Sequence, residues 1–149
     1  LKRQGSGYVV EKLFREHYAE KRFASTSGTF RDLPNRNVFF DDISQMKPEA
    51  WRPGTLDANA TGSADGRRIV IKAVNYEAQT NTLLVRLQGA GVPKNATVKT
   101  FTLTAALTDA PSLEQPDRIQ PVATSLSFAR DLAIDLPPCS VCVVEISAD

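Results

Sequence analysis

The chain has 149 residues, of which 42% are hydrophobic and 23% charged, and this fits one folded domain with a genuine core rather than a disordered tail. Its 18 basic and 17 acidic residues are scattered and leave a net charge of +1, so we expect no binding surface for nucleic acid or an anionic membrane. No apolar run approaches the roughly 20 residues that cross a bilayer, and the N-terminus lacks a signal-peptide pattern.

The first predicted element is a helix from Gly7 to about Lys21, with Ser6 as its N-terminal cap. Its apolar side should pack against another part of the protein. A single histidine on such a side is compatible with a ligand or a general base, but it is more often a packed residue with one satisfied nitrogen, and we favour that structural role. The predicted stripe consists of Val10, Leu13, Phe14, His17 and Tyr18.

Residues 23–55 show no regular pattern, and we expect an irregular connecting segment. Asp41 and Asp42 are adjacent carboxylates, but the spaced oxygen ligands of a calcium loop are missing, so we favour a solvated turn. Trp51 lies between two prolines, where it would either stack on a sugar ring or pin the segment to a neighbouring domain. We favour pinning.

The orderly part of the chain begins at Leu56 with a short alternating strand and an Asp65-Gly66 turn. Residues 67–87 then alternate as two strands, with Ile69, Ile71 and Ala73 on one face of the first and Leu83, Val85 and Leu87 on one face of the second. The five residues between them, 75–79, are polar and few, so we expect the two strands to be antiparallel neighbours in a hairpin.

The remaining strands are predicted at 97–107, at SLSFA, at DLAIDL and at 140–146. Short strands separated by turns predict an antiparallel sandwich. Two carboxylate pairs lie nearby, Asp131 with Asp135 and Glu114 with Asp117, but no apolar pocket that would raise one pKa is evident. We therefore expect no catalytic residue in this part of the chain.

The two cysteines, Cys139 and Cys142, form a C-x-x-C pair, which is compatible with redox chemistry or half of a zinc site. We favour two ordinary strand cysteines, because residues three apart on a strand face opposite sides and further zinc ligands are missing. Two N-A-T sequons, at Asn59 and Asn95, are weak signals for glycosylation in a eukaryotic secreted protein.

Four segments together resemble the C-terminal part of bacterial α-L-arabinofuranosidases of glycoside hydrolase family 51. GYVVEKLFREHYA resembles the last helix of that family's (β/α)8 catalytic barrel. The other three, LDANATGSADGRRIVIKAVNYE, SLEQPDRIQPVATSLSF and DLPPCSVCVVEI, resemble its C-terminal jelly-roll β-sandwich. The similarity covers 7–18 and 56–146, and Cys139 departs from the histidine or other polar residue expected at its position.

The resemblance implies a mainly β fold, an antiparallel jelly-roll-like β-sandwich preceded by one helix. It divides the chain into the last barrel helix at 1–22, a connecting segment at 23–55 and the sandwich at 56–149. The family consists of retaining hydrolases that release arabinofuranose from arabinan or arabinoxylan with two barrel glutamates about 5 Å apart. Both glutamates lie upstream of the last helix, so we expect this chain alone to be inactive, with no catalytic, cofactor or metal site.

The partners implied by the resemblance are the catalytic barrel of the same protein and, through the parent enzyme, an arabinose-containing polysaccharide. The family also forms oligomers, and an extracellular or periplasmic location is favoured over a cytoplasmic one. If the helix stripe lies on the junction with the barrel, the chain without its barrel should expose it and bind a hydrophobic dye. The alternatives are a carbohydrate-binding module that uses Trp51 and a purely structural sandwich.

Overall fold

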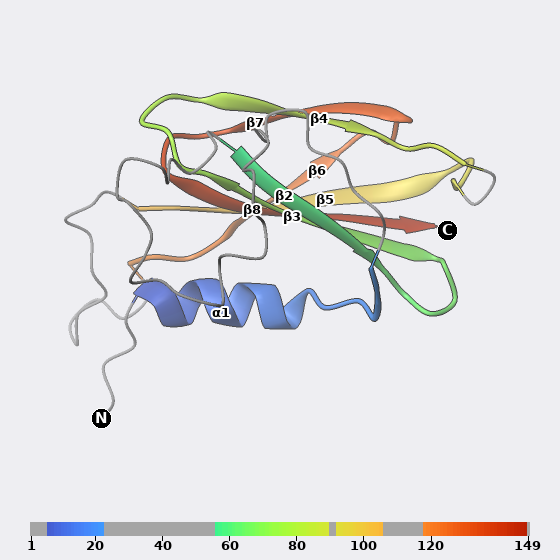
Figure 1. Ribbon diagram of the computed structural model, residues 1–149, viewed down its shortest axis with the longest axis horizontal. Coiled ribbons are helices and arrows are strands. Elements are labelled where there is room, and N and C mark those ends of the chain that lie inside the picture. Colours follow the sequence, from blue (N-terminus) through green and yellow to red (C-terminus); the bar gives the residue numbers. More distant parts are fainter. Residues whose placement is uncertain (1–5, 23–55, 90–91, 106–117, 149) are drawn as a thin grey trace, which may run out of the picture.

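The computed structural model describes residues 6–22, 56–89, 92–105 and 118–148, which form three layers (Figure 1). The middle layer is a six-stranded sheet, a two-stranded sheet covers one of its faces, and a helix covers the other. The elements are α1 (Ser6–Glu16), β1 (Lys21–Arg22), β2 (Leu56–Gly62), β3 (Arg68–Asn75), β4 (Asn81–Arg86), β5 (Ala96–Thr104), β6 (Val122–Leu126), β7 (Asp131–Leu136) and β8 (Ser140–Ala148).

All strand pairs within these sheets are antiparallel, which confirms the predicted mainly β sandwich preceded by a helix. The six-stranded sheet has the order β1-β2-β3-β8-β5-β6, and β4 pairs with β7 in the second sheet. β8 is central, because Cys142 lies opposite Ala73 of β3 on one side and opposite Thr102 of β5 on the other.

Two apolar cores lie on the two faces of the six-stranded sheet. The core between the sheets contains Ile71, Val144 and Leu136, and the core under α1 contains Val70 and Val143. Neighbouring residues of β3 and β8 therefore enter different cores, as the period of two along a strand requires. Both faces of these strands are buried, which explains why their sequences are almost continuously apolar.

The helix begins at Ser6, one residue earlier than predicted. It is nevertheless shorter than predicted, because it ends at Glu16 rather than near Lys21. The chain after it bends and adds the two-residue strand β1 to the edge of the sheet. Tyr18 is consequently 61% exposed and does not belong to the apolar face. The buried side chains here are Val9, Leu13 and Ala19, with Val10 and Phe14 packed against them.

The stripe of α1 lies against the sheet of the same chain, so the expectation that it is exposed without a barrel is wrong. The outward-facing side chains of the helix are mostly charged, namely Glu11, Lys12, Arg15 and Glu16, with Tyr8 beside them at 48% exposure. The helix therefore buries its single apolar face on the sandwich.

The predicted hairpin at 67–87 is wrong in its pairing, although both strands and their inward faces are correct. β3 has β2 on one edge and β8 on the other, so no edge remains for β4. The chain instead crosses from one sheet to the other after Asn75, and β4 pairs with β7. A five-residue polar loop serves either connection, so loop length and polarity alone do not distinguish them.

The turn before β3 and the other predicted strands are present, but the strand expected at SLSFA begins earlier, because β6 spans Val122–Leu126 and includes only the first two residues of that segment. The last two residues of the strand expected at 97–107 lie outside the described residues. The Asp65-Gly66 turn joins β2 and β3, with Gly66 at φ 74° and its amide donating to Ser63 O at 3.0 Å. The pKa of the Asp65 carboxyl is lowered, first by the hydrogen bond from the Ser63 hydroxyl and then by that from the Arg67 amide.

In the described ranges no helix has the length and apolar character needed to span a membrane.

Candidate functional site

In the described part of the chain, most of the partly buried charged side chains lie where α1 meets the six-stranded sheet. Arg68 and Lys72 of β3 and Glu145 of β8 lie on the sheet face that carries Val70 and Val143, the face covered by α1. Charged residues on an otherwise apolar face require partners, because an unpaired buried charge is costly. The partners come from the C-terminal part of α1 and the turn after it.

His17 and Glu145 form the centre of this junction. His17 Nδ1 lies 2.8 Å from Glu145 Oε1, and the two side chains are only 13% and 17% exposed. Since an ionised carboxylate only accepts hydrogen bonds, the Nδ1 proton is donated to it. Arg68 Nη1 lies 3.8 Å from the same carboxylate oxygen, and the His17 ring packs on Phe101 with ring centroids 4.1 Å apart.

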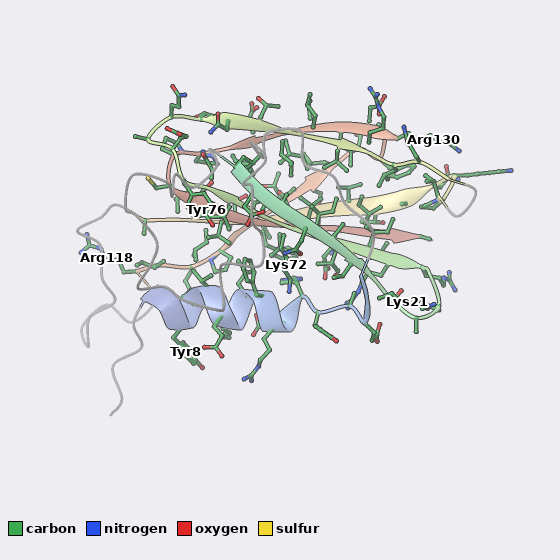
Figure 2. The ribbon with its side chains drawn as sticks, viewed as in Figure 1. Tyr8, Lys21, Lys72, Tyr76, Arg118 and Arg130 are labelled. Carbon is green, nitrogen blue, oxygen red and sulfur yellow. The ribbon has the colours of Figure 1, made fainter. Side chains whose placement is uncertain are left out.

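Two cations of β3 bind main-chain carbonyls, one in the last turn of α1 and one just after the helix. Lys72 Nζ donates to Phe14 O at 2.7 Å and lies 5.1 Å from the centre of the Phe14 ring, and Arg68 Nη2 donates to Tyr18 O. Figure 2 shows Lys72 between the sheet and the helix. Carbonyls at a helix C-terminus lack intrahelical partners and carry partial negative charge, so cations stabilise them. Burial lowers the pKa of Lys72 from its ordinary value.

The segment that follows the helix is attached to the turn before β3. Lys21 Nζ donates to Ala64 O at 2.7 Å, and the Ala64 amide donates to Glu20 Oε2 at 3.1 Å. Together with the short strand β1, these bonds hold the chain from His17 to Arg22 along one edge of the sheet. The junction therefore attaches both the helix and the segment that follows it to the sandwich.

The structure gives His17 the packed role that we favoured, with one nitrogen satisfied by a carboxylate. A histidine oriented by a carboxylate also occurs in catalytic sites, where the histidine contacts a nucleophile or a substrate. Here the His17 ring packs on an aromatic side chain, and the carboxylate is shared with an arginine. The arrangement thus fixes the helix to the sheet.

The predicted carboxylate pair on β7 is solvent-exposed, and each member has another partner. Asp131 Oδ1 accepts from Arg86 Nε at 2.9 Å, and Asp135 Oδ1 accepts from the Thr82 hydroxyl at 2.8 Å. Four residues along a strand span about 13 Å, whereas glycosidases place their two carboxyls about 5 to 10 Å apart. Among the described residues, no three His, Cys, Asp or Glu side chains come together as a metal site.

The two cysteines are free and lie in different surroundings. Cys139 is exposed in the turn before β8, with φ 48° and its amide donating to Glu77 O at 2.9 Å. Cys142 is buried between the sheets, and burial raises the pKa of its thiol, opposed by hydrogen bonds from Thr102 and from the Phe101 backbone. The prediction of two strand cysteines is therefore correct for Cys142, which lies in β8, and wrong for Cys139, which lies in the turn before it.

The remaining predicted residues divide into exposed ones and ones beyond the described ranges. Asn59 on β2 and Asn95 before β5 are both exposed. The others, Asp41, Asp42, Trp51, Glu114 and Asp117, lie outside the described residues.

Glu145, Arg68 and Lys72 were not predicted as members of a site. Their signal in the sequence is a charged residue at an inward position of a strand that is apolar on both faces, as in RIVIKAVN and VCVVEIS. Such a position requires a buried partner. The partner, His17, is 128 residues from Glu145 in the chain, so only the topology brings the two together.

No protein-family model matches the sequence, and no curated protein matches it. Solved structures of family 51 α-L-arabinofuranosidases match its fold. The enzyme from Thermotoga petrophila RKU-1 is 23% identical with a TM-score of 0.56, and the match covers 63% of this chain and 19% of that one. AbfB from Bifidobacterium longum is 24% identical with a TM-score of 0.54, and the match covers 63% of this chain and 19% of that one.

A third match includes almost the whole chain. The arabinose-bound MgGH51 α-L-arabinofuranosidase is 17% identical with a TM-score of 0.71, and the match covers 99% of this chain and 20% of that one. The chain therefore spans about a fifth of the length of these enzymes. At these identities the matches establish a shared fold.

Proposed function

We propose that the chain is the C-terminal portion of an α-L-arabinofuranosidase related to glycoside hydrolase family 51, in which it serves as a non-catalytic accessory β-sandwich. The observation that carries this proposal is the match of 99% of the chain to one fifth of such an enzyme, at a TM-score of 0.71. Within the described residues, the segments that resemble this family in sequence lie mainly in α1, β2, β3, β6 and β8, so sequence and fold point to the same enzymes.

A non-catalytic role is supported by the partners and the exposure of the described carboxylates. Glu145 is shared by His17 and Arg68, and Asp131 and Asp135 are exposed on β7 with partners of their own. A retaining glycosidase needs one carboxyl acid and one carboxylate nucleophile facing the same glycosidic bond. In this proposal both belong to the catalytic barrel of the parent enzyme, which also binds the arabinose-containing polysaccharide.

The barrel of the same protein is the proposed partner of the sandwich, and helix α1 is proposed as the last helix of that barrel. Because the apolar face of α1 is buried on the sheet, the helix has its charged outer face, with Tyr8, left for contact with the barrel. Interfaces between domains of one chain are commonly more polar than domain cores. The proposed contact is therefore polar.

A carbohydrate-binding module is less well supported by the described residues. Sugar binding by stacking needs aromatic side chains on one surface. The exposed aromatic side chains here are Tyr8, Tyr18 and Tyr76, and Figure 2 shows Tyr8 on the outer side of the helix and Tyr76 well away from it, next to the sheets. Tyr8 and Tyr76 therefore do not share one platform.

The proposal is tested by comparing the natural gene product with this 149-residue chain. Intact mass gives the length of the natural product, and hydrolysis of p-nitrophenyl α-L-arabinofuranoside gives the activity of each. We expect a product of several hundred residues that hydrolyses the substrate, and no hydrolysis by the chain alone. A natural product of about the length of this chain would overturn the proposal, as would hydrolysis by the chain alone.

A further inference from the structure

Strand β6 forms an open edge of the six-stranded sheet. It pairs with β5 along one side, from Val98 opposite Leu126 to Thr102 opposite Val122, and within the described ranges no strand pairs with its other side. Four of its five residues are exposed, and Val122 is 66% exposed. An open edge presents main-chain donors and acceptors to any strand that can lie beside it.

Other edge strands of the described fold carry the features that prevent such pairing. β1 is only two residues long and both are basic, and the small sheet carries Arg86, Asp131 and Asp135 on exposed positions of β4 and β7. Short length and charges are the usual protection of sheet edges. The sequence of β6, VATSL, contains neither a charge nor a proline.

We propose that β6 pairs antiparallel with β6 of a second copy of the chain, about a two-fold axis through Thr124. In this register Val122 lies opposite Leu126 of the second copy, Ala123 opposite Ser125, and Thr124 opposite itself. Val122 and Leu126 thus form apolar pairs, the two Thr124 hydroxyls meet each other, the small residues Ala123 and Ser125 face each other, and no like charges meet within the paired strands. A two-fold pairing is closed, because the same surface serves both copies.

The same register covers the most exposed apolar side chain of the strand. Val122 and Leu126 lie on the face of Val98, which belongs to the core between the two sheets. Leu126 packs at the border of that core, whereas Val122 lies outside the core and is exposed. Leu126 of the second copy would extend this apolar surface over Val122. The chain's net charge of +1 opposes self-association little.

A five-residue strand buries little area, so we expect a weak dimer whose population rises with concentration. This inference does not depend on the proposed enzyme, since it concerns the 149-residue chain itself. Sedimentation velocity at about 10 μM to 1 mM measures the dimer population, a range chosen for a weak interface. We expect Thr124→Lys to weaken dimerisation at least tenfold, because two lysines would face each other, and the exposed β7 variant Ala133→Lys to dimerise like the wild type.

A disulfide trap tests the register independently. In a Cys139→Ser background, which removes the exposed thiol, Thr124→Cys places two thiols across the two-fold axis at a distance that a disulfide can bridge. We expect mild oxidation to link this variant at least tenfold faster than Ala133→Cys in the same background. The proposal is overturned if the wild type stays monomeric throughout the range, if both lysine variants dimerise equally, or if both cysteine variants are linked at the same rate.

Discussion

Asn75 holds the corner at which the chain passes from one sheet to the other. Its side chain is 1% exposed, and Nδ2 lies 2.8 to 3.0 Å from the carbonyl oxygens of Gln79, Leu136 and Pro137. Its Oδ1 accepts from the Glu77 amide and from Asn81 Nδ2. One amide side chain thus joins the end of β3, the start of β4 and the end of β7.

Replacement of Asn75 by alanine should lower the free energy of unfolding by about 3 kcal/mol, because several buried main-chain groups would lose their partner at about 1 to 3 kcal/mol each. Urea unfolding measures the change. Asn59→Ala, at an exposed position of β2, is the matched control and should change the stability by less than about 0.5 kcal/mol. Equal effects of the two substitutions would contradict the role given to Asn75.

The two thiols should differ strongly in reactivity. Cys139 is exposed, whereas Cys142 is fully buried and its thiol pKa is raised. Since the thiolate is the reactive form, we expect Cys139 to react with a maleimide at least about a hundredfold faster in the native protein. Mass spectrometry of labelled peptides measures both rates, and Cys139→Ser should abolish the fast phase. Rapid native labelling of Cys142 would show that the core between the sheets opens readily.

At the scale of single residues, the sequence allowed part of the site to be predicted. The role of His17 followed from its place on an amphipathic helix, which is a local pattern. Its partner Glu145 and the cations Arg68 and Lys72 could not be assigned, because their contacts depend on which sheet face the helix covers. Local periodicity determines which residues share a face but not what packs against it.

At the scale of elements, the helix and sheet are joined by apolar packing and by cations that bind the helix C-terminus. Lys72 contributes to both, through its hydrogen bond to Phe14 O and its position near the Phe14 ring. Burial lowers the pKa of Lys72 below 10.5, so this junction should respond to alkaline pH. The direction in which stability changes with pH depends on whether the folded or the unfolded chain binds more protons.

Between the folded-state pKa of Lys72 and the unfolded value of 10.5, the unfolded chain binds more protons, so the Lys72 contribution to stability rises with pH. We expect the stability of the wild type relative to Lys72→Met to increase from neutral pH toward 10.5. The slope stays well below the one-proton limit of about 1.4 kcal/mol per pH unit, because Lys72 is only partly buried.

Urea unfolding of both proteins at several pH values measures this difference. The thiol of Cys142 also titrates in this range, with a raised pKa that makes stability fall as pH rises above 9.0, but this contribution is common to both proteins and cancels. A difference that decreases toward pH 10.5 would contradict the assignment.

The strands were predicted more reliably than their neighbours. Alternation identified β3 and β4, β-branched composition identified β8, and the Asp65-Gly66 turn correctly joined β2 to β3. The hairpin between β3 and β4 failed, because β2 and β8 already occupy both edges of β3. Pairing is decided by competition for edges across the whole chain, and β8 begins 65 residues after Asn75. A local turn signal contains no information about that competition.

At the scale of the whole molecule, a sandwich was predicted but the three-layer arrangement was not. The amphipathic helix indicated that an apolar face must be covered, and the covering surface is the sheet of the same chain. Both faces of β3 and β8 are therefore buried without any contribution from a further domain.

The final prediction concerns the apolar surface that α1 covers. Leu13 is 2% exposed against Val70, Val143 and Leu103, whereas Tyr18 is 61% exposed. The wild-type chain should bind little hydrophobic dye. Leu13→Asp should release the helix, because an unpaired carboxylate would be buried at its centre, and should raise dye fluorescence several-fold. Tyr18→Asp should leave it unchanged.

Two further measurements separate release of the helix from unfolding of the whole chain. Circular dichroism should retain the β-sheet signal in Leu13→Asp, and hydrogen exchange should accelerate in α1 much more than in β8. Strong dye binding by the wild type would instead mean that α1 needs a covering domain, as the apolar stripe alone suggested. Because the charged face of α1 points outward and its C-terminal end is bound by Lys72 and Arg68, we expect the covered arrangement in the isolated chain.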